Sequence, residues 1–158
     1  MTGGIVTDTM ARDPIATHGF SLVVVRRGRR ALLVHERKHG QLWYLPAGRK
    51  DPGETWADAA IRETREEAGI DVVLEGILGI EHRPLPDSAR IRVIYLAREA
   101  DDTPPKRVAD EHTLEARFFT LEEMRTLPLR GDDVLQWVEH ALAGIAAPLS
   151  LLDERHLP

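Results

Sequence analysis

The sequence predicts one α/β domain of the α+β kind, with a mixed β-sheet covered by helices on both faces. Segments rich in β-branched residues outnumber helical segments. These strand segments follow one another on either side of one helix, so a doubly wound parallel sheet is not expected. The chain has 158 residues, 42% of them hydrophobic and 30% charged, which suits one domain with a sizeable core.

The first half of the chain predicts three strands and a helix. Residues 1–16 are rich in Gly, Thr and Asp without periodicity, and we expect a flexible N-terminal tail before a single domain of residues 17–158. Strands are expected at 18–26 and 30–36, joined as a hairpin, and at 42–45. A Pro-Gly turn at Asp51-Pro52-Gly53 then leads to the helix.

The second half predicts three more strands and two helices. Residues 71–83 and 89–98 read as a long hairpin, and a polar loop at 100–110 precedes a last strand at 114–119. Thr120 opens a short helix with a capping-box pattern. Residues 132–143 form an amphipathic helix with Trp137 in its apolar face. The pattern assigns no role to residues 149–158.

The helix after the Pro-Gly turn has clear limits. Thr55 is a suitable N-cap and Gly69 a suitable stop. Its apolar stripe, predicted to pack on the sheet, consists of Ala57, Ile61, Thr64 and Ala68.

Three carboxylates share another arc of this helix. Glu63, Glu66 and Glu67 fall within about 100° of one another and repel. A hard divalent cation removes this repulsion, and Mg²⁺ prefers carboxylate oxygens, with Mn²⁺ as the alternative. A solvated acidic surface, paired with Arg62 and Arg65, is the other interpretation.

The spacing over residues 48–70 resembles the Nudix box. Its specified positions are Gly48, Glu54, Arg62-Glu63, Glu66-Glu67, Gly69 and Ile70. Thr64 departs from the pattern, because the family usually has an aliphatic residue there. The resemblance implies a Nudix-type α/β/α sandwich with a mixed central sheet, acting as a pyrophosphohydrolase. It also implies Mg²⁺-dependent hydrolysis of a nucleoside diphosphate-type phosphoanhydride.

The same resemblance implies roles for particular residues. Metal ligands would be Glu63, Glu66, Glu67 and the carbonyl of Ala47. Arg62 and Glu54 would form an ion pair that orients the ligand glutamates, since useful ligands need support from outside the metal shell.

The general base remains open at this point. Glu111 is the first choice, because it lies in a loop before the last strand, with His112 or Glu66 as alternatives. Tyr44, with Trp43, lines the nucleoside pocket or packs in the core. Arg49, with Lys50, contacts phosphates or is solvated.

A looser similarity extends over residues 18–158. The pieces WYLPAGR, PGET, VIYLAR and LPLRGDDVLQWVEHAL are similar to the branch of the family that hydrolyses 8-oxo-guanine nucleoside diphosphates. This similarity implies that the protein sanitises oxidised guanine nucleotides. The alternatives are ADP-ribose, a sugar nucleotide, a dinucleoside polyphosphate or an RNA 5′ end as substrate. A non-catalytic nucleotide-binding module is the third interpretation, and the complete set of glutamates speaks against it.

Composition and charge limit the kinds of partner and site that the protein is expected to have. A net charge of −5 argues against broad nucleic-acid binding, but not against a small nucleotide. The absence of cysteine excludes disulfides, thiolate zinc sites and cysteine nucleophiles. No apolar run is long enough for a membrane span and no signal pattern is present, so we expect a cytoplasmic protein without membrane contact. The family resemblance suggests a monomer or homodimer.

Overall fold

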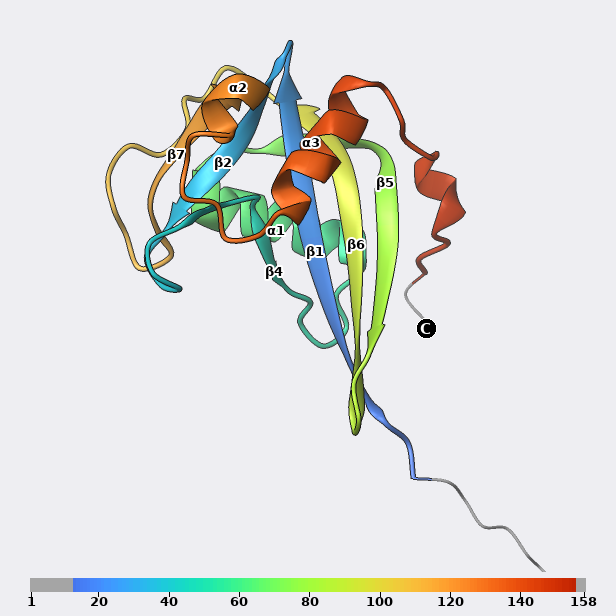
Figure 1. Ribbon diagram of the computed structural model, residues 1–158. Helices are drawn as coiled ribbons and strands as arrows, with labels where there is room; N and C mark the ends of the chain where they lie inside the picture. The colour runs from blue at the N-terminus through green and yellow to red at the C-terminus, as the bar shows by residue number, and fades with distance from the viewer. Residues whose placement is uncertain (1–12, 156–158) are drawn as a thin grey trace, which may run out of the picture.

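The computed structural model describes residues 13–155 and confirms a mixed sheet with helices on both faces (Figure 1). The sheet order is β3-β2-β1-β6-β5, with β4 paired to β1 and β7 paired to β2. The strands are β1 (Ala16–Arg27), β2 (Arg30–Glu36), β3 (Trp43–Tyr44), β4 (Ala47–Arg49), β5 (Val72–Pro84), β6 (Ser88–Glu99) and β7 (Thr113–Thr120). The helices are α1 (Trp56–Ala68), α2 (Leu121–Met124), α3 (Asp133–Leu142) and the short 3-10 helix η1 (Leu149–Leu151).

Strand β1 is the centre of the sheet. It pairs in parallel with β6 from Ala16 opposite Ser88 to Val25 opposite Ala97, and antiparallel with β2 and β4. Its side chains alternate between two cores, as the strand period of two requires. Leu22 and Val24 belong to the core under α3, whereas Val23 and Val25 belong to the core under α1.

Helix α1 begins and ends as the sequence predicts. The Thr55 side chain accepts a hydrogen bond from the Asp58 amide, and Gly69 ends the helix at a φ of 72°. Of the predicted stripe, Thr64 and Ala68 are buried, whereas Ala57 and Ile61 are only partly buried. The deepest positions also include Ala59 and Ala60, so the buried face is turned relative to the prediction.

Thr64 is accommodated at a buried position without an unpaired hydroxyl. Its Oγ1 donates to the carbonyl oxygen of Ala60 at 2.8 Å. A threonine that bonds back within its own helix satisfies its polar atom. The departure at Thr64 therefore leaves the packing of α1 intact.

Helix α3 covers the opposite face and confirms the predicted core role of Trp137. Its buried residues are Val134, Trp137, Val138 and Ala141. The indole of Trp137 packs on Gly79 of β5 so closely that a Cβ there would lie 2.5 Å from the ring. No helix in the described part of the chain has the length and hydrophobicity needed to cross a bilayer.

The segment after α3 returns to the start of α1. Ala147 exchanges backbone hydrogen bonds with Ile77 of β5, and η1 follows. The Glu154 carboxylate then accepts from the backbone N–H groups of Trp56 and Ala57. These donors lack intrahelical partners, so a carboxylate at the positive end of the helix dipole stabilises the start of α1. The predicted tails, residues 1–16 and 149–158, lie partly outside the described residues.

We expect Glu154→Ala to destabilise the protein by about 0.5–2 kcal/mol, the usual effect of losing an N-terminal cap. Urea unfolding followed by circular dichroism would measure the change. Asp153→Ala is the matched control, because Asp153 is exposed and pairs with Arg155. Equal stability of the two variants would show that Glu154 does not cap α1.

Candidate active site

Strand β4 and helix α1 bring Gly48 against Glu63. A Cβ placed on Gly48 would lie 1.9 Å from the carboxyl carbon of Glu63. The carboxylate therefore occupies the space that any side chain at position 48 would take. Glycine is needed here for close approach, since the acid is packed against the backbone.

Glu67 lies beside Glu63 on the same side of α1. Its Oε2 accepts from the backbone N–H of Ala47 at 2.9 Å. Burial raises the pKa of Glu67 to about 8, and the nearby carboxylates of Glu63 and Glu36 add to the shift. Burial also raises the pKa of Glu63. Both acids are thus withdrawn from water, which disfavours their charged forms.

Arg62 holds the remaining acids together. Its Nε and Nη2 donate to Glu54 at 2.7 and 2.9 Å, while Nη1 donates to Glu63 at 2.8 Å and to Glu66 at 3.2 Å. Hydrogen bonding from Arg62 lowers the pKa of Glu54 below its ordinary value. The predicted Arg62–Glu54 pair is thus present, and the same guanidinium also contacts two of the predicted ligands.

The donor set suits a hard divalent cation. Within residues 13–155 the Glu67 carboxyl group has no ion pair, although it is buried and flanked by another acid. A buried carboxylate in this state would be stabilised by a cation. Across the described residues, no three acidic or histidine side chains already converge closely enough to enclose an ion. Arg62 lies between Glu63 and Glu66 instead, and Glu66, at 36% exposure, has room to turn.

A cleft of about 330 Å³ opens beside these acids. Ala47, Gly48 and Glu67 form its acidic wall. The remaining lining comes mainly from aromatic and arginine side chains: Phe20, Leu22, Glu36, His39, Tyr44, Arg90, Arg92 and Arg130. The volume is that of a site for a small organic molecule.

Tyr44 serves both the core and the cleft. Its side chain belongs to the core under α3, while its hydroxyl accepts from Arg92 Nη1 at 3.0 Å. Arg92 is itself held by Glu81 and by Asp133 of α3. Arg49, the other predicted substrate contact, does not line the cleft, and its guanidinium lies 2.8 Å from Nδ1 of His18.

Glu36 and Arg130 are cleft residues that the sequence analysis missed. Arg130 Nη1 donates to Glu36 Oε1 at 2.6 Å, and the Arg130 guanidinium lies over the Tyr44 ring. Glu36 Oε2 is buried and has no partner among the described residues. Glu36 continues the alternating line of Leu32 and Val34, both buried, so an acid in an apolar strand pattern was the available signal.

An adjoining cavity of about 200 Å³ contains the predicted base. Glu67, Glu111 and His112 line it together, with Glu36, Arg37, Lys38 and His39. The Glu111 side chain is 86% exposed and lies 3.4 Å from His112 Nε2. The structure thus brings both candidates to the side of α1 that carries Glu67.

Comparisons with known proteins give matches in sequence and in fold. The NUDIX domain family matches residues 17–138. The human 8-oxo-dGDP phosphatase NUDT18 is 38% identical over 113 residues, covering 70% of this chain and 34% of that protein. A putative 8-oxo-dGTP diphosphatase of Bacillus subtilis is 43% identical over 68 residues, covering 43% of this chain and 45% of that protein. The chain therefore spans less than half the length of these two relatives.

A solved structure shows the same fold over most of the chain. The NUDIX hydrolase from Nitrosomonas europaea superimposes with a TM-score of 0.76 at 27% identity, covering 89% of this chain and 98% of that one.

We expect Gly48→Ala to weaken divalent-metal binding by at least about tenfold, because the added Cβ displaces the Glu63 carboxylate from its cradle. Isothermal titration with Mn²⁺ would measure the affinity, and thermal unfolding would show whether the fold is retained. Unchanged Mn²⁺ affinity in a folded variant would mean that Glu63 does not bind the ion from this position.

Proposed function

Because this chain belongs to the NUDIX domain family, we propose that it hydrolyses a phosphoanhydride bond of a small nucleotide with the help of Mg²⁺. The observation that carries the proposal is the cluster of three glutamates on one turn of α1, of which Glu67 lines a cleft of about 330 Å³. The buried Glu67, which has no ion pair among the described residues, is the member of this cluster that most needs a cation.

Each residue of the cluster has a separate task in this proposal. Glu63, Glu66 and Glu67 would hold the ion, with Mn²⁺ as the alternative to Mg²⁺. Bound there, the ion would offset the negative charge of the substrate's phosphates and make a water molecule easier to deprotonate. Arg62, fixed by Glu54, keeps two of the glutamates oriented through hydrogen bonds to both. Ala47 fixes Glu67 through its amide, and its carbonyl is the proposed fourth ligand.

Glu111 is the proposed general base. Asp110 Oδ1 accepts from the amides of His112 and Thr113, which folds the loop into a tight turn around Glu111. The cavity that Glu111 shares with Glu67 leaves room for a water between them. His112 and Glu66 are the alternatives for this role. His112 lies beside Glu111, and Glu66 is paired with Arg62 within the acidic cluster.

An oxidised guanine nucleoside diphosphate is the proposed substrate, cut to the monophosphate. Relatives that carry this activity or a similar one in their names support it. The cleft volume of about 330 Å³ suits one nucleoside better than the two of a dinucleoside polyphosphate. ADP-ribose, sugar nucleotides and RNA 5′ ends are the competing substrates. A cytoplasmic location, a monomeric or homodimeric state and a single domain at 17–158 stay predictions.

A nucleotide panel tests the substrate. With Mg²⁺ present, we expect 8-oxo-dGDP to be hydrolysed faster than dGDP, ADP-ribose or diadenosine tetraphosphate, as measured by kcat/KM from chromatographic quantification of the nucleotide products. Chelation by EDTA should abolish turnover, because the cation neutralises the diphosphate. A preference for ADP-ribose would mean that the protein is a hydrolase with a different substrate. Inactivity on the whole panel would favour a non-catalytic nucleotide-binding module.

Glu67→Gln and Glu66→Gln test the metal ligands. We expect each to lower kcat by at least about 100-fold with little change in melting temperature, since a neutral amide is a poorer ligand than a carboxylate.

Glu111→Gln tests the base, with an expected loss in kcat of about 100-fold or more. Glu122→Gln, at an exposed position of α2, is the matched control. Full activity of Glu111→Gln would move the base to His112 or Glu66.

A further inference from the structure

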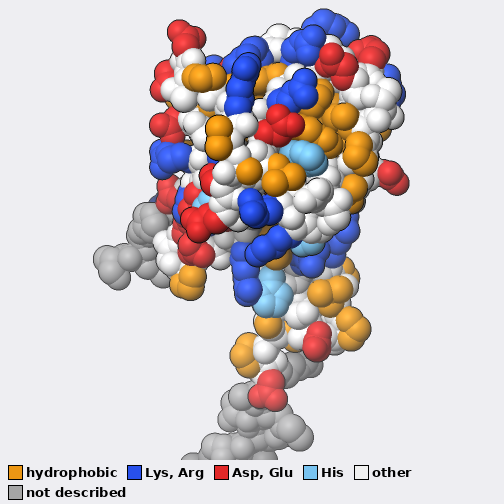
Figure 2. Space-filling view, turned by 90° about the vertical axis from the view of Figure 1, so that its left-hand side faces the viewer, with side chains coloured by type: hydrophobic (Ala, Val, Ile, Leu, Met, Phe, Trp, Pro, Cys, Tyr) orange, Lys and Arg blue, Asp and Glu red, His pale blue; other side chains and the backbone are white. Residues whose placement is uncertain are grey.

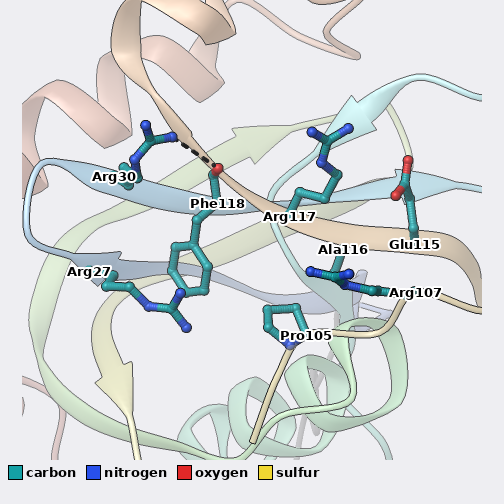
Figure 3. Close-up of a pocket in the computed structure, with 8 residues that line it drawn as sticks. All are labelled: Arg27, Arg30, Pro105, Arg107, Glu115, Ala116, Arg117 and Phe118. Atoms are coloured by element: carbon teal, nitrogen blue, oxygen red, sulfur yellow. Dashed lines mark hydrogen bonds between the residues drawn. The ribbon is translucent and has the colours of Figure 1, made fainter. Parts of the chain in front are cut away.

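A second and larger hollow lies beside the edge strand β7. Its volume is about 630 Å³, and it shares no lining residue with the cleft at α1. We call it the arginine groove, because four of its lining side chains are arginines. The lining residues are Arg27, Arg30, Pro105, Arg107, Glu115, Ala116, Arg117 and Phe118 (Figure 3).

The arginines reach the groove from three separate segments. Arg27 and Arg30 lie on either side of the β1–β2 turn, Arg117 lies on β7, and Arg107 lies in the loop before β7. In Figure 3 the side chains of Arg27 and Arg107 enter from opposite sides, toward the Phe118 ring and Pro105. The Arg27 guanidinium carbon is 4.0 Å from the centre of the Phe118 ring. The groove therefore combines cationic groups with an apolar wall.

Two of the four positive charges are not neutralised by the protein. Arg27 is paired with Glu99 and Arg30 with Glu123. Within residues 13–155, neither Arg107 nor Arg117 has a carboxylate partner. Of these two arginines, only Arg117 contacts an aromatic ring among the described residues, that of Phe119. The face shown in Figure 2 carries many Lys and Arg side chains, interspersed with acidic and hydrophobic ones. An excess of local positive charge in a chain of net charge −5 needs an explanation.

We propose that the arginine groove binds the phosphate of a small anionic molecule, at a site separate from the cleft. Guanidinium groups match phosphate oxygens with paired N–H donors, so Arg107 can bind a dianion within the groove, while Arg117, which points to the other face of β7, adds positive charge at the rim. The volume is that of a small-molecule site. Free pyrophosphate and the phosphate chain of a nucleotide offer the same chemistry, and Phe118 with Pro105 gives a nucleotide a surface for its ring.

The groove is connected to the glutamate cluster through one residue. Lys106 lies between Pro105 and Arg107, and its Nζ donates to the carbonyl oxygen of Glu66 at 2.6 Å. Its own carbonyl accepts from the Ala116 amide at 2.8 Å. A ligand that contacts Arg107 therefore binds the loop that holds the last turn of α1.

The test is titration of EDTA-treated protein with sodium pyrophosphate, followed by calorimetry and by amide chemical shifts. We expect shifts at Arg107, Ala116 and Phe118 that saturate with pyrophosphate. The double variant Arg107→Gln/Arg117→Gln should bind at least about tenfold more weakly, because it loses both unpaired guanidinium groups. Both positions are exposed, so the fold should be retained, and thermal unfolding checks this. The single variants provide the same comparison if the double variant unfolds.

Arg155→Gln is the matched control, because it removes one positive charge from a 79% exposed side chain outside the groove. It should bind pyrophosphate as the unaltered protein does. Titration with ADP distinguishes the source of the phosphate: tighter binding than pyrophosphate at the same amides indicates a nucleotide, and equal or weaker binding indicates the free anion. Unchanged pyrophosphate affinity in Arg107→Gln/Arg117→Gln, or shifts confined to Tyr44 and Gly48, would overturn the proposal.

Discussion

Like charges brought together where α1 meets β4 are the constraint on which the rest of the site depends. Glu54, Glu63 and Glu66 are tolerated next to one another because one guanidinium, that of Arg62, donates to all three. Glu67 is left outside this neutralisation and is buried with a raised pKa. The protein alone thus disfavours the charged form of Glu67, which a bound cation would stabilise. That need is the physical reason for expecting a cation at this turn rather than a solvated acidic surface.

Such a cluster is useful only if α1 is held in place, and distant segments fix both of its ends. Glu154 binds the first amides of the helix. At the other end, Lys106 and Thr113 donate to the carbonyl oxygens of Glu66 and Glu67. These contacts satisfy terminal groups that have no partner within the helix. They also connect the helix to the loop that carries Glu111, so the ligands and the proposed base are positioned by one set of hydrogen bonds.

The strands other than β4, the limits of α1 and the Arg62–Glu54 pair could be predicted because they depend on local pattern and spacing. Glu36, Arg130 and Glu154 could not, since each acquires its role from a partner far away in the chain, as Glu154 does from Trp56. The rotation of the buried face of α1 relative to the predicted stripe also depends on a partner distant in the chain, the sheet. Periodicity gives the angle between residues but not the direction from which the sheet approaches, and Ala59 and Ala60 are small enough to meet it directly.

Net charge was the least informative property of the sequence. A value of −5 averages over an acidic turn on α1 and four arginines around one groove. The two regions meet at neighbouring residues of the loop before β7. Lys106 Nζ donates to the carbonyl oxygen of Glu66, and Arg107 lines the groove. At physiological salt, charges separated by more than about 8 Å are largely screened from each other in solvent. Opposite local charges can therefore coexist in one small domain, and each region attracts a different kind of ligand.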